Sequence, residues 1–324
     1  MKNLHKTCFG DGDAYTDFFF AERYPSAKSY VTELDGRPVS VVYARFFELN
    51  ILGRKLEVPF FTGIATDPAY RGRHLATDLI AKACDDLAAE GYPFVLLHPF
   101  NHDFYRKMGF GTANRMSRFS PAPYVARADG ERAARPLTTD DAEAAYALYS
   151  EYTASVPAAR VRSREEFFKA FRQLLIDGGS GYLILHNGIP KAYFLIEENE
   201  VTEAVASIPD AFSGVAECLK YDMPLHDSLG DAYSMAKVLN LRNLFLLLPL
   251  RGVTVNARFG YGGKTYELNI EKGDLVSLEE VTGEGYEVGS SELIEIALGG
   301  GIRLRGNPLS EVFPEYNLVM FEKY

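Results

Sequence analysis

Hydrophobic and polar positions in the first third of the chain change repeatedly between helical and strand periodicity. Residues 16–23 are rich in aromatic side chains and predict a helix, whereas residues 39–46 form a β-branched and aromatic run that predicts a strand. Residues 56–66 are almost wholly apolar, which is typical of a strand buried on both faces. From Leu75 to Leu87, apolar residues recur at helical spacing and predict an amphipathic helix.

Shorter elements complete this region. Residues 94–98 predict a short buried strand, and residues 103–108 predict a helical turn that ends at Gly109. Residues 116–119 predict a further strand. Because strands and helices alternate here, the sequence predicts an α/β unit.

The middle of the chain repeats this plan. Residues 121–136 have no clear periodicity and predict a linker. The segment after it predicts helices at 138–152, 164–176 and 210–221, and strands at 182–186, 192–197 and 201–206. We therefore expect a boundary near residue 122 and a second domain built like the first.

The pattern changes again in the last hundred residues. Helices are predicted at 234–248 and 291–298, with a hairpin of 253–259 and 264–270 between them. The chain is thus expected to combine α/β and α+β folds in three domains, which cover residues 1–122, 123–225 and 226–324.

Composition narrows the class of protein. The chain has 47% hydrophobic and 24% charged residues, as ordinary globular proteins do. Its longest apolar run, residues 244–250, contains Pro249 and is far below the ~18 residues of a membrane span. No apolar leader follows Met1, so we expect no membrane association and a cytoplasmic location. Three scattered cysteines predict neither a disulfide framework nor a zinc site, and no metal is expected.

The charge balance is acidic. Lys and Arg number 34 against 44 Asp and Glu, a formal net charge of -10. Such a field repels phosphate backbones and weakly favours cationic ligands. Nucleic acid is therefore not expected as a partner.

Residues 64–76 carry the most specific chemical signal, because a buried strand leads through a polar loop into an amphipathic helix. The first N–H groups of a helix have no intrahelical partner and lie at the positive end of its dipole. They can hold a diphosphate, with Arg71 and Arg73 adding positive charge and Gly72 allowing a tight turn. A plain strand-to-helix turn with solvated arginines has the same spacing, so spacing alone leaves both interpretations open.

Two motifs resemble those of the general N-acetyltransferase (GNAT) superfamily. The run Arg71-Gly72-Arg73-His74-Leu75-Ala76 is similar to its acyl-CoA diphosphate loop, R/Q-x-x-G-x-G/A. Residues 101–110, an Asn followed by Tyr-x-x-x-Gly-Phe, resemble its second signature. Two features depart from the family pattern: His74 stands where glycine is usual, so its side chain must point away from the cofactor, and the family's first strand is short or missing.

The resemblance implies a GNAT mixed-sheet domain that uses acetyl-CoA as co-substrate. Pantetheine would lie beside the strand at Ile64, Ala65 and Thr66, and Asn101 would contribute to the same site. The diphosphate would meet the N–H groups from Arg71 onward. Tyr105 would be the catalytic acid, since a phenol of pKa near ~10 can donate to a thiolate whose conjugate thiol has a pKa near ~8.5.

The whole chain resembles acetyltransferases of the enhanced-intracellular-survival (Eis) type. This implies a second, degenerate GNAT-like domain and a C-terminal sterol-carrier-like α+β domain; in the second domain the loop 207–210 has no basic residue, so we expect no CoA site there. In that family the terminal carboxylate assists the acceptor amine, which implies a role for Tyr324. The resemblance also makes a homo-oligomer an expectation.

Other signals are weaker. The Gly263-Lys264-Thr265 run fits a hairpin better than a phosphate loop. His98 and His102 lack further ligands for a metal, although His98, at a strand end, is a candidate proton relay. The sequence therefore predicts direct acetyl transfer to a small-molecule primary amine in a ternary complex. The alternative is a non-catalytic acyl-CoA sensor or a protein that binds a lipid-like ligand.

Overall fold

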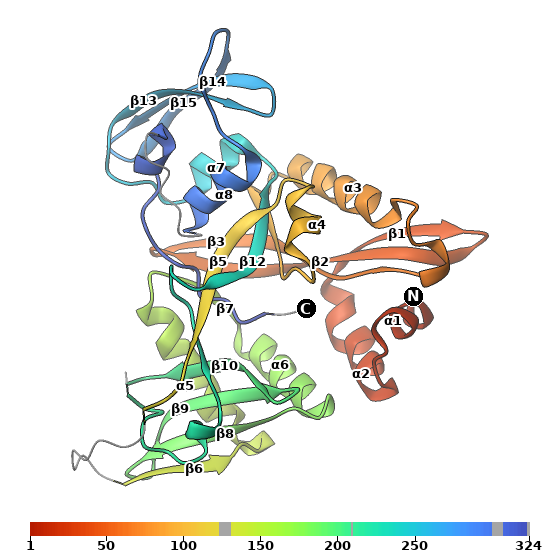
Figure 1. Ribbon diagram of the computed structural model, residues 1–324, viewed down its shortest axis with the longest axis vertical. Coiled ribbons are helices and arrows are strands. Elements are labelled where there is room, and N and C mark those ends of the chain that lie inside the picture. The colour runs from red at the N-terminus through yellow and green to blue at the C-terminus, as the bar shows by residue number, and fades with distance from the viewer. Residues whose placement is uncertain (123–130, 209, 300–306, 323–324) are drawn as a thin grey trace.

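The computed structural model describes residues 1–122, 131–208, 210–299 and 307–322. The strands form three sheets: one of eight strands and two of four. Figure 1 shows the second and third sheets at opposite ends of the molecule, with the first sheet between them. None of the helices in these ranges has the length and apolarity needed to cross a lipid bilayer.

The first sheet has the order β1-β2-β3-β4-β12-β5-β11, and β7 pairs with β2. Its strands are β1 (Lys28–Leu34), β2 (Arg37–Ile51), β3 (Arg54–Thr66), β4 (Phe94–Leu97), β5 (Gly111–Phe119), β7 (Ala158–Val161), β11 (Met223–Leu225) and β12 (Asp231–Val238). The predicted strands at 39–46, 56–66, 94–98 and 116–119 are confirmed within this set. β2 and β3 are longer than expected because they pair along almost their whole length.

Helices cover both faces of this sheet. α3 (Leu75–Ala89) buries Leu79, Ile80 and Ala83 on one face, so the predicted amphipathic helix is confirmed. On the other face lie α1 (Lys2–Phe9), α2 (Asp13–Phe18) and the π-helical turn Phe19–Arg23. Their core contacts with β2 and β3 are made by Leu4 and Phe19. The helix predicted at 16–23 is therefore confirmed, but α1 was not expected.

The second sheet has the order β10-β9-β8-β6. Its elements are β6 (Arg132–Pro136), α5 (Ala142–Ser155), α6 (Arg164–Ile176), β8 (Ser180–His186), β9 (Ile189–Glu197) and β10 (Glu200–Ala206). The predicted helices and strands between 138 and 206 are thereby confirmed. The predicted linker 121–136 is wrong over its last five residues, where β6 forms an edge strand with few apolar side chains.

The helix predicted at 210–221 is wrong. The described part of this segment is a series of turns with one 3-10 turn, Cys218–Lys220. Gly214 has a φ of +73°, a left-handed conformation that interrupts any helix. Its N–H instead donates to the carbonyl of Ala122 at 3.1 Å. The buried side chains of this segment, Ala211, Phe212 and Val215, keep helical spacing and pack on the second sheet, so the apolar pattern was interpreted correctly but the backbone turns instead of forming a helix.

The third sheet has the order β15-β14-β13-β16 and packs with two helices. Its elements are α7 (Leu241–Leu247), β13 (Val255–Tyr261), β14 (Lys264–Glu271), β15 (Asp274–Val281), β16 (Tyr286–Glu287) and α8 (Ser290–Leu298). The predicted hairpin and the helix at 291–298 are confirmed. The first half of the helix predicted at 234–248 is wrong, because residues 231–238 form strand β12.

β12 lies between β4 and β5 in the first sheet, antiparallel to both. Met235 and Ala236 are fully buried there. A short apolar run of this kind is compatible with either a helix or a strand. It forms a strand here because both of its edges can pair, one with β4 and the other with β5. A segment from the predicted third domain therefore completes the sheet that carries the first domain.

Candidate active site

β3 and β4 separate partway along their length. These parallel strands pair only at Phe60 with Leu96 and at Phe61 with Leu97, where β4 ends. β3 continues to Thr66, and its other edge stays paired with β2. Residues 62–66 therefore expose one edge of main-chain N–H and C=O groups, which an extended ligand containing amides can pair with as an added strand would.

A β-bulge lies at the start of this free edge. Val41 pairs with Ala65, but Tyr43 pairs with Thr62, so β3 holds one extra residue between these pairs. Within the bulge, Gly63 has a φ of +56°, which favours glycine. Bulges bend a strand and redirect its groups, and this one turns β3 just beyond the last pair with β4.

The loop after β3 holds a left-handed backbone at two positions. Asp67 Oδ1 accepts a hydrogen bond from the N–H of Ala69 at 2.9 Å, and Arg71 Nε donates to the carbonyl of Thr66 at 3.2 Å. Gly72 has a φ of +77° and His74 a φ of +60°. The conformation at His74 is one that glycine adopts without strain, which explains why the related motif has glycine there. His74 itself is exposed, and α3 begins at the next residue.

The predicted cofactor-binding residues lie along one continuous stretch of backbone. Three of them are on the free edge of β3, four are in the loop and two are in the first turn of α3: Ile64, Ala65, Thr66; Arg71, Gly72, Arg73, His74; Leu75, Ala76. Both loop arginines are exposed, and the Arg73 guanidinium lies 5.1 Å from the ring centre of Tyr70. This path leads from the bulge to the N-terminus of a 15-residue helix, where N–H groups point outward.

Tyr105 and Asn101 come together on the short helix α4 (His102–Arg106), which follows β4. Asn101 is the N-cap, and its Oδ1 accepts from the N–H of Phe104 at 3.1 Å. Tyr105 is 2% exposed and belongs to the same core cluster as Phe61 and Leu97, the last pair of β3 and β4. Burial raises the pKa of the Tyr105 phenol, which therefore stays protonated and able to donate.

The C-terminal region braces the turn that follows α4. Ser290 Oγ donates to the carbonyl of Gly109, and Ser291 Oγ donates to that of Phe110, both at 2.8 Å. The N–H of Phe110 in turn donates to the carbonyl of Tyr105 at 3.1 Å. The N-terminus of α8 thus fixes the segment that holds Tyr105.

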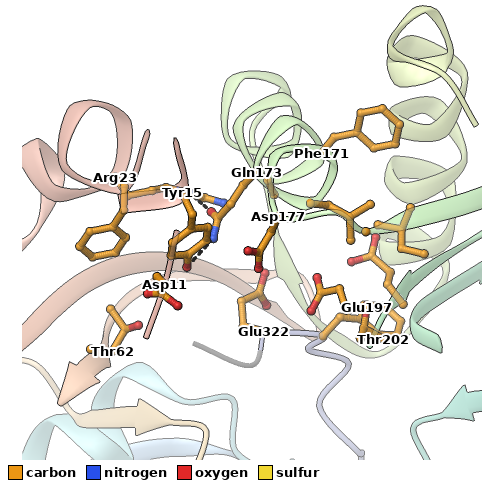
Figure 2. A pocket seen from close by; sticks show the side chains of 18 of the residues that line it. Asp11, Tyr15, Arg23, Thr62, Phe171, Gln173, Asp177, Glu197, Thr202 and Glu322 are labelled. Atoms are coloured by element: carbon orange, nitrogen blue, oxygen red, sulfur yellow. Dashed lines mark hydrogen bonds between the residues drawn. The ribbon is translucent and has the colours of Figure 1, made fainter. Parts of the chain in front are cut away.

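A cavity of about 480 Å³ opens on the bulge from the face opposite α3. Thr62 and Gly63 line it, together with the N-terminal helices, α6, the second sheet and the end of the described chain (Figure 2). Six carboxylates and four guanidiniums from the described residues line its walls: Asp11, Asp177, Glu197, Glu198, Glu203 and Glu322, with Arg23, Arg45, Arg160 and Arg162. In Figure 2, Asp11, Asp177 and Glu322 project into the same space.

His5 and Asp177 on the cavity wall both have pKa values shifted by burial. His5 is buried, with Nε2 2.9 Å from Asp11 Oδ2, and burial lowers its pKa despite this neighbour. Burial, together with Asp11 and Glu198, raises the pKa of Asp177. A cation placed among these carboxylates would offset their mutual repulsion.

Buried ion pairs hold the end of the chain against this cavity. Glu322 Oε1 accepts from Arg162 Nε at 2.8 Å, and Arg162 Nη1 donates to Glu203 Oε2 at 2.7 Å. Arg160 also pairs with Glu322, and the N–H of Arg160 donates to the carbonyl of Val319 at 2.9 Å. The predicted catalytic residue Tyr324 lies outside the described residues.

The segment before the chain end also passes the end of β4. His98, the first residue after β4, has its ring 4.7 Å from that of Tyr233. The Tyr233 hydroxyl donates to the carbonyl of Phe321 at 3.3 Å. His98 and Phe321 therefore both contact Tyr233, close to where β3 and β4 separate. In the described ranges, no group of three or more His, Cys, Asp or Glu side chains is arranged so that it could hold a metal ion.

Sequence reasoning did not find the walls of this cavity. His5 and Asp11 lie on and just after a helix that was not predicted, and Asp177 follows α6 without any local motif. Arg45 lies inside β2 and Arg160 inside β7, both among mostly apolar neighbours, and a charged residue inside a buried strand was the available signal.

Comparison with known proteins agrees with this geometry. Residues 1–113 match a family model described as an acetyltransferase (GNAT) domain. A search of curated proteins finds no match. The prediction of a GNAT-type acetyltransferase is confirmed for this part of the chain, and with it the mixed α/β GNAT-like fold.

Solved structures share the fold over nearly the whole chain. A GCN5-related N-acetyltransferase from Anabaena variabilis has a TM-score of 0.72 at 14% identity, covering 99% of this chain and 95% of that one. One from Kribbella flavida has a TM-score of 0.69 at 15% identity, covering 99% and 94%. Eis1 from Mycobacterium abscessus has a TM-score of 0.67 at 12% identity, covering 98% and 95%. At these identities the likeness establishes the fold alone.

Proposed function

We propose that the protein is an acetyl-CoA-dependent N-acetyltransferase that transfers acetyl to a primary amine by direct attack in a ternary complex. The observation that carries this proposal is the free edge of β3 at residues 62–66. This edge leads to the N-terminus of α3 at one end and meets the acid-lined cavity at Thr62 and Gly63 at the other. A thioester substrate and an amine substrate can therefore meet at the bulge.

The free edge and the loop suit the two ends of acetyl-CoA. The amides of pantetheine can pair with the main chain of Ile64, Ala65 and Thr66. The diphosphate suits the first N–H groups of α3 and the exposed Arg71 and Arg73. Gly72 and His74 both have left-handed backbone conformations, which turn the loop from the end of β3 toward the N-terminus of α3.

The reaction forms one bond and breaks one. The amine nitrogen attacks the acetyl carbon, a C–N bond forms, and the C–S bond breaks to release CoA thiolate. The buried Tyr105 hydroxyl is assigned as the donor to that leaving thiolate. Cys84 does not serve as an acyl carrier, since it is buried in α3 and burial raises the pKa of its thiol to about 11.

Once the C–N bond has formed, the nitrogen carries a positive charge and gives its proton to water on the side of the cavity. We assign the terminal carboxylate of Tyr324 to electrostatic help for the ammonium, because the chain is anchored two residues earlier by Glu322 and runs past the end of β4 at Phe321. The carboxylates Asp11 and Asp177 support the same choice of a cationic acceptor.

The other two regions are assigned supporting roles. The second domain would bind no CoA, and its α6 supplies one wall of the cavity. The C-terminal region, which we propose to be sterol-carrier-like, packs Phe245, Phe259 and Phe313 into one core cluster with side chains of the first sheet. It braces the turn after Tyr105 through α8.

Thiol release tests the proposal. The full chain is incubated with acetyl-CoA and a panel of polyamines, aminoglycosides, amino acids and peptides, and acetylated product is identified by mass spectrometry. Release with at least one amine class, abolished without amine, is the expected result. Tight acetyl-CoA binding by calorimetry with no release from any amine would favour a non-catalytic acyl-CoA sensor instead.

A further inference from the structure

Two buried arginines on the cavity wall differ from the other two. Arg23 ends the π-helical turn and Arg45 lies in β2, and they are 8% and 9% exposed. Arg160 and Arg162 form ion pairs with glutamates. Within the described ranges, neither Arg23 nor Arg45 has a carboxylate partner.

The few contacts of these two side chains leave donors unused. Arg23 Nε donates to Gln173 Oε1 at 2.8 Å, and Gln173 Nε2 donates to the Tyr15 hydroxyl at 2.9 Å (Figure 2). The Arg45 guanidinium lies 5.0 Å from the ring centre of Phe47. A guanidinium carries five N–H donors. Within the described residues, Arg23 uses its Nε donor for Gln173, and no hydrogen bond to protein is made by the other donors of Arg23 or by those of Arg45.

Their charges also repel each other. Burial, Arg45 and Arg162 lower the pKa of Arg23 to about 9, and burial lowers the pKa of Arg45 to about 10, so both stay charged at neutral pH. Glu166 partly offsets both charges, but it forms its ion pair with Arg160, and buried cations that lack a carboxylate in direct contact are costly to the fold. A planar anion that accepts paired hydrogen bonds would relieve that cost, and a carboxylate has this geometry.

Arg45 lies close to the reaction centre. It is two residues from Tyr43 in β2, and Tyr43 pairs with Thr62 while Arg45 pairs with Phe60. Arg45 and Thr62 are therefore on one face of the sheet as diagonal neighbours, roughly 7–8 Å apart at their Cα atoms. A small molecule can reach from the Arg45 guanidinium to the bulge at Gly63.

We infer that the acceptor is an amino-carboxylate of the amino-acid type, whose carboxylate binds Arg23 and Arg45 while its amine meets the acetyl group at Gly63. This inference rests on the proposed function and narrows its substrate class. The carboxylates Asp11 and Asp177 lie on the same cavity and suit the amine end. Simple polyamines, which lack an anion, would leave both arginines unpaired and would be poor acceptors.

Matched acceptors give the first test. L-lysine is compared with cadaverine, its decarboxylated counterpart, and L-phenylalanine with its amide, in thiol release and in calorimetry with CoA present. For at least one pair we expect kcat/KM to be 10-fold or more higher for the acid. Equal kcat/KM for acid and counterpart in both pairs would overturn the inference, and so would a consistent preference for the counterparts that lack the carboxylate.

Variants give the second test. In Arg45→Gln and Arg23→Gln, kcat/KM for the preferred acid is expected to fall 10-fold or more, with an unchanged KM for acetyl-CoA and an unchanged rate with the decarboxylated acceptor. Arg45→Lys keeps the positive charge but not the paired donors, so its kcat/KM for the preferred acid should lie between that of the parent and that of Arg45→Gln. Arg37→Gln, on the exposed start of β2, is the control and should match the parent. Equal losses for acid and counterpart would contradict the assignment.

Two readouts work without turnover. Removing an unpaired buried charge should raise the unfolding midpoint of ligand-free Arg45→Gln, whereas a structural ion-pair role would lower it. Calorimetry should show at least one of L-lysine and L-phenylalanine binding to the parent and neither binding to Arg45→Gln. If this binding difference appears while no acceptor releases thiol, the proposed function fails and the anion site stands. If thiol is released but Arg45→Gln binds the same acid as the parent does, with equal affinity, only the anion site fails.

Discussion

Gly63 in β3 lies directly against the ring of Tyr43 in β2, so that a Cβ atom on Gly63 would be 2.5 Å from Cδ2 of Tyr43. The glycine also has a φ of +56°. Both facts come from the bulge that begins the free edge of β3, and both prevent any side chain at this position.

Gly63→Ala should therefore damage stability and activity together. The added methyl must push the Tyr43 ring, and the left-handed backbone costs about 1 kcal/mol or more for a non-glycine residue. We expect chemical denaturation to show a loss of about 1–3 kcal/mol and steady-state kinetics to show a large fall in kcat. Gly36→Ala, with a φ of +70° but no atom within 4 Å of its Cβ, is the control. An active Gly63→Ala would contradict the role of the bulge.

Tyr105→Phe should lower kcat by about 100-fold while the KM for acetyl-CoA changes little, because the hydroxyl is assigned to the leaving thiolate. The ring packs among Phe100, Phe104 and Phe110, and a phenylalanine keeps these contacts. Stability should therefore be unchanged within about 1 kcal/mol by denaturation. Full turnover in this variant would remove the acid assignment.

The buried ion pairs at the end of the chain should be important for stability. Glu203→Gln leaves Arg162, which is 6% exposed at its side chain, with a weaker partner, and the predicted cost is about 3 kcal/mol by denaturant titration. Glu48→Gln removes an exposed pair with Lys55 and should cost less than about 1 kcal/mol. Similar costs in the two variants would mean that the buried pair of Arg162 and Glu203 stabilises the fold no more than an exposed pair does.

The position of the terminal carboxylate can be tested without deleting any side chain. One glycine added after Tyr324 moves the carboxylate while Glu322 and its partners Arg160 and Arg162 remain. We expect kcat to fall at least 10-fold, since the acceptor ammonium loses electrostatic help, with the unfolding midpoint unchanged. If kcat is unaffected, the terminal carboxylate has no part in the reaction.

Sequence patterns predicted those elements whose determining residues lie close together in the chain. α3 and α6 show helical periodicity, and α6 also carries the capping box of Ser163 and Glu166, so their limits follow from the sequence. The loop Arg71–Ala76 was found because its residues are contiguous. β12 could not be placed, because its apolar run is short and its partners β4 and β5 lie more than 110 residues earlier in the chain.

The cavity beside the bulge escaped prediction for a related reason. Its walls come from α1, β2, α6, β10 and the chain end, which only the folded chain brings together. No spacing links Arg23 to Arg45, or Glu203 to Glu322. The left-handed backbone at His74, by contrast, could have been expected from the glycine of the related motif.

Amide hydrogen exchange with and without acetyl-CoA tests the central claim most directly. If acetyl-CoA lies along β3 and the start of α3, exchange should slow at residues 62–66 and 72–77 and stay unchanged in the hairpin of β14 and β15. Protection of the third sheet, or acetyl-CoA binding without protection of residues 62–66, would contradict the account.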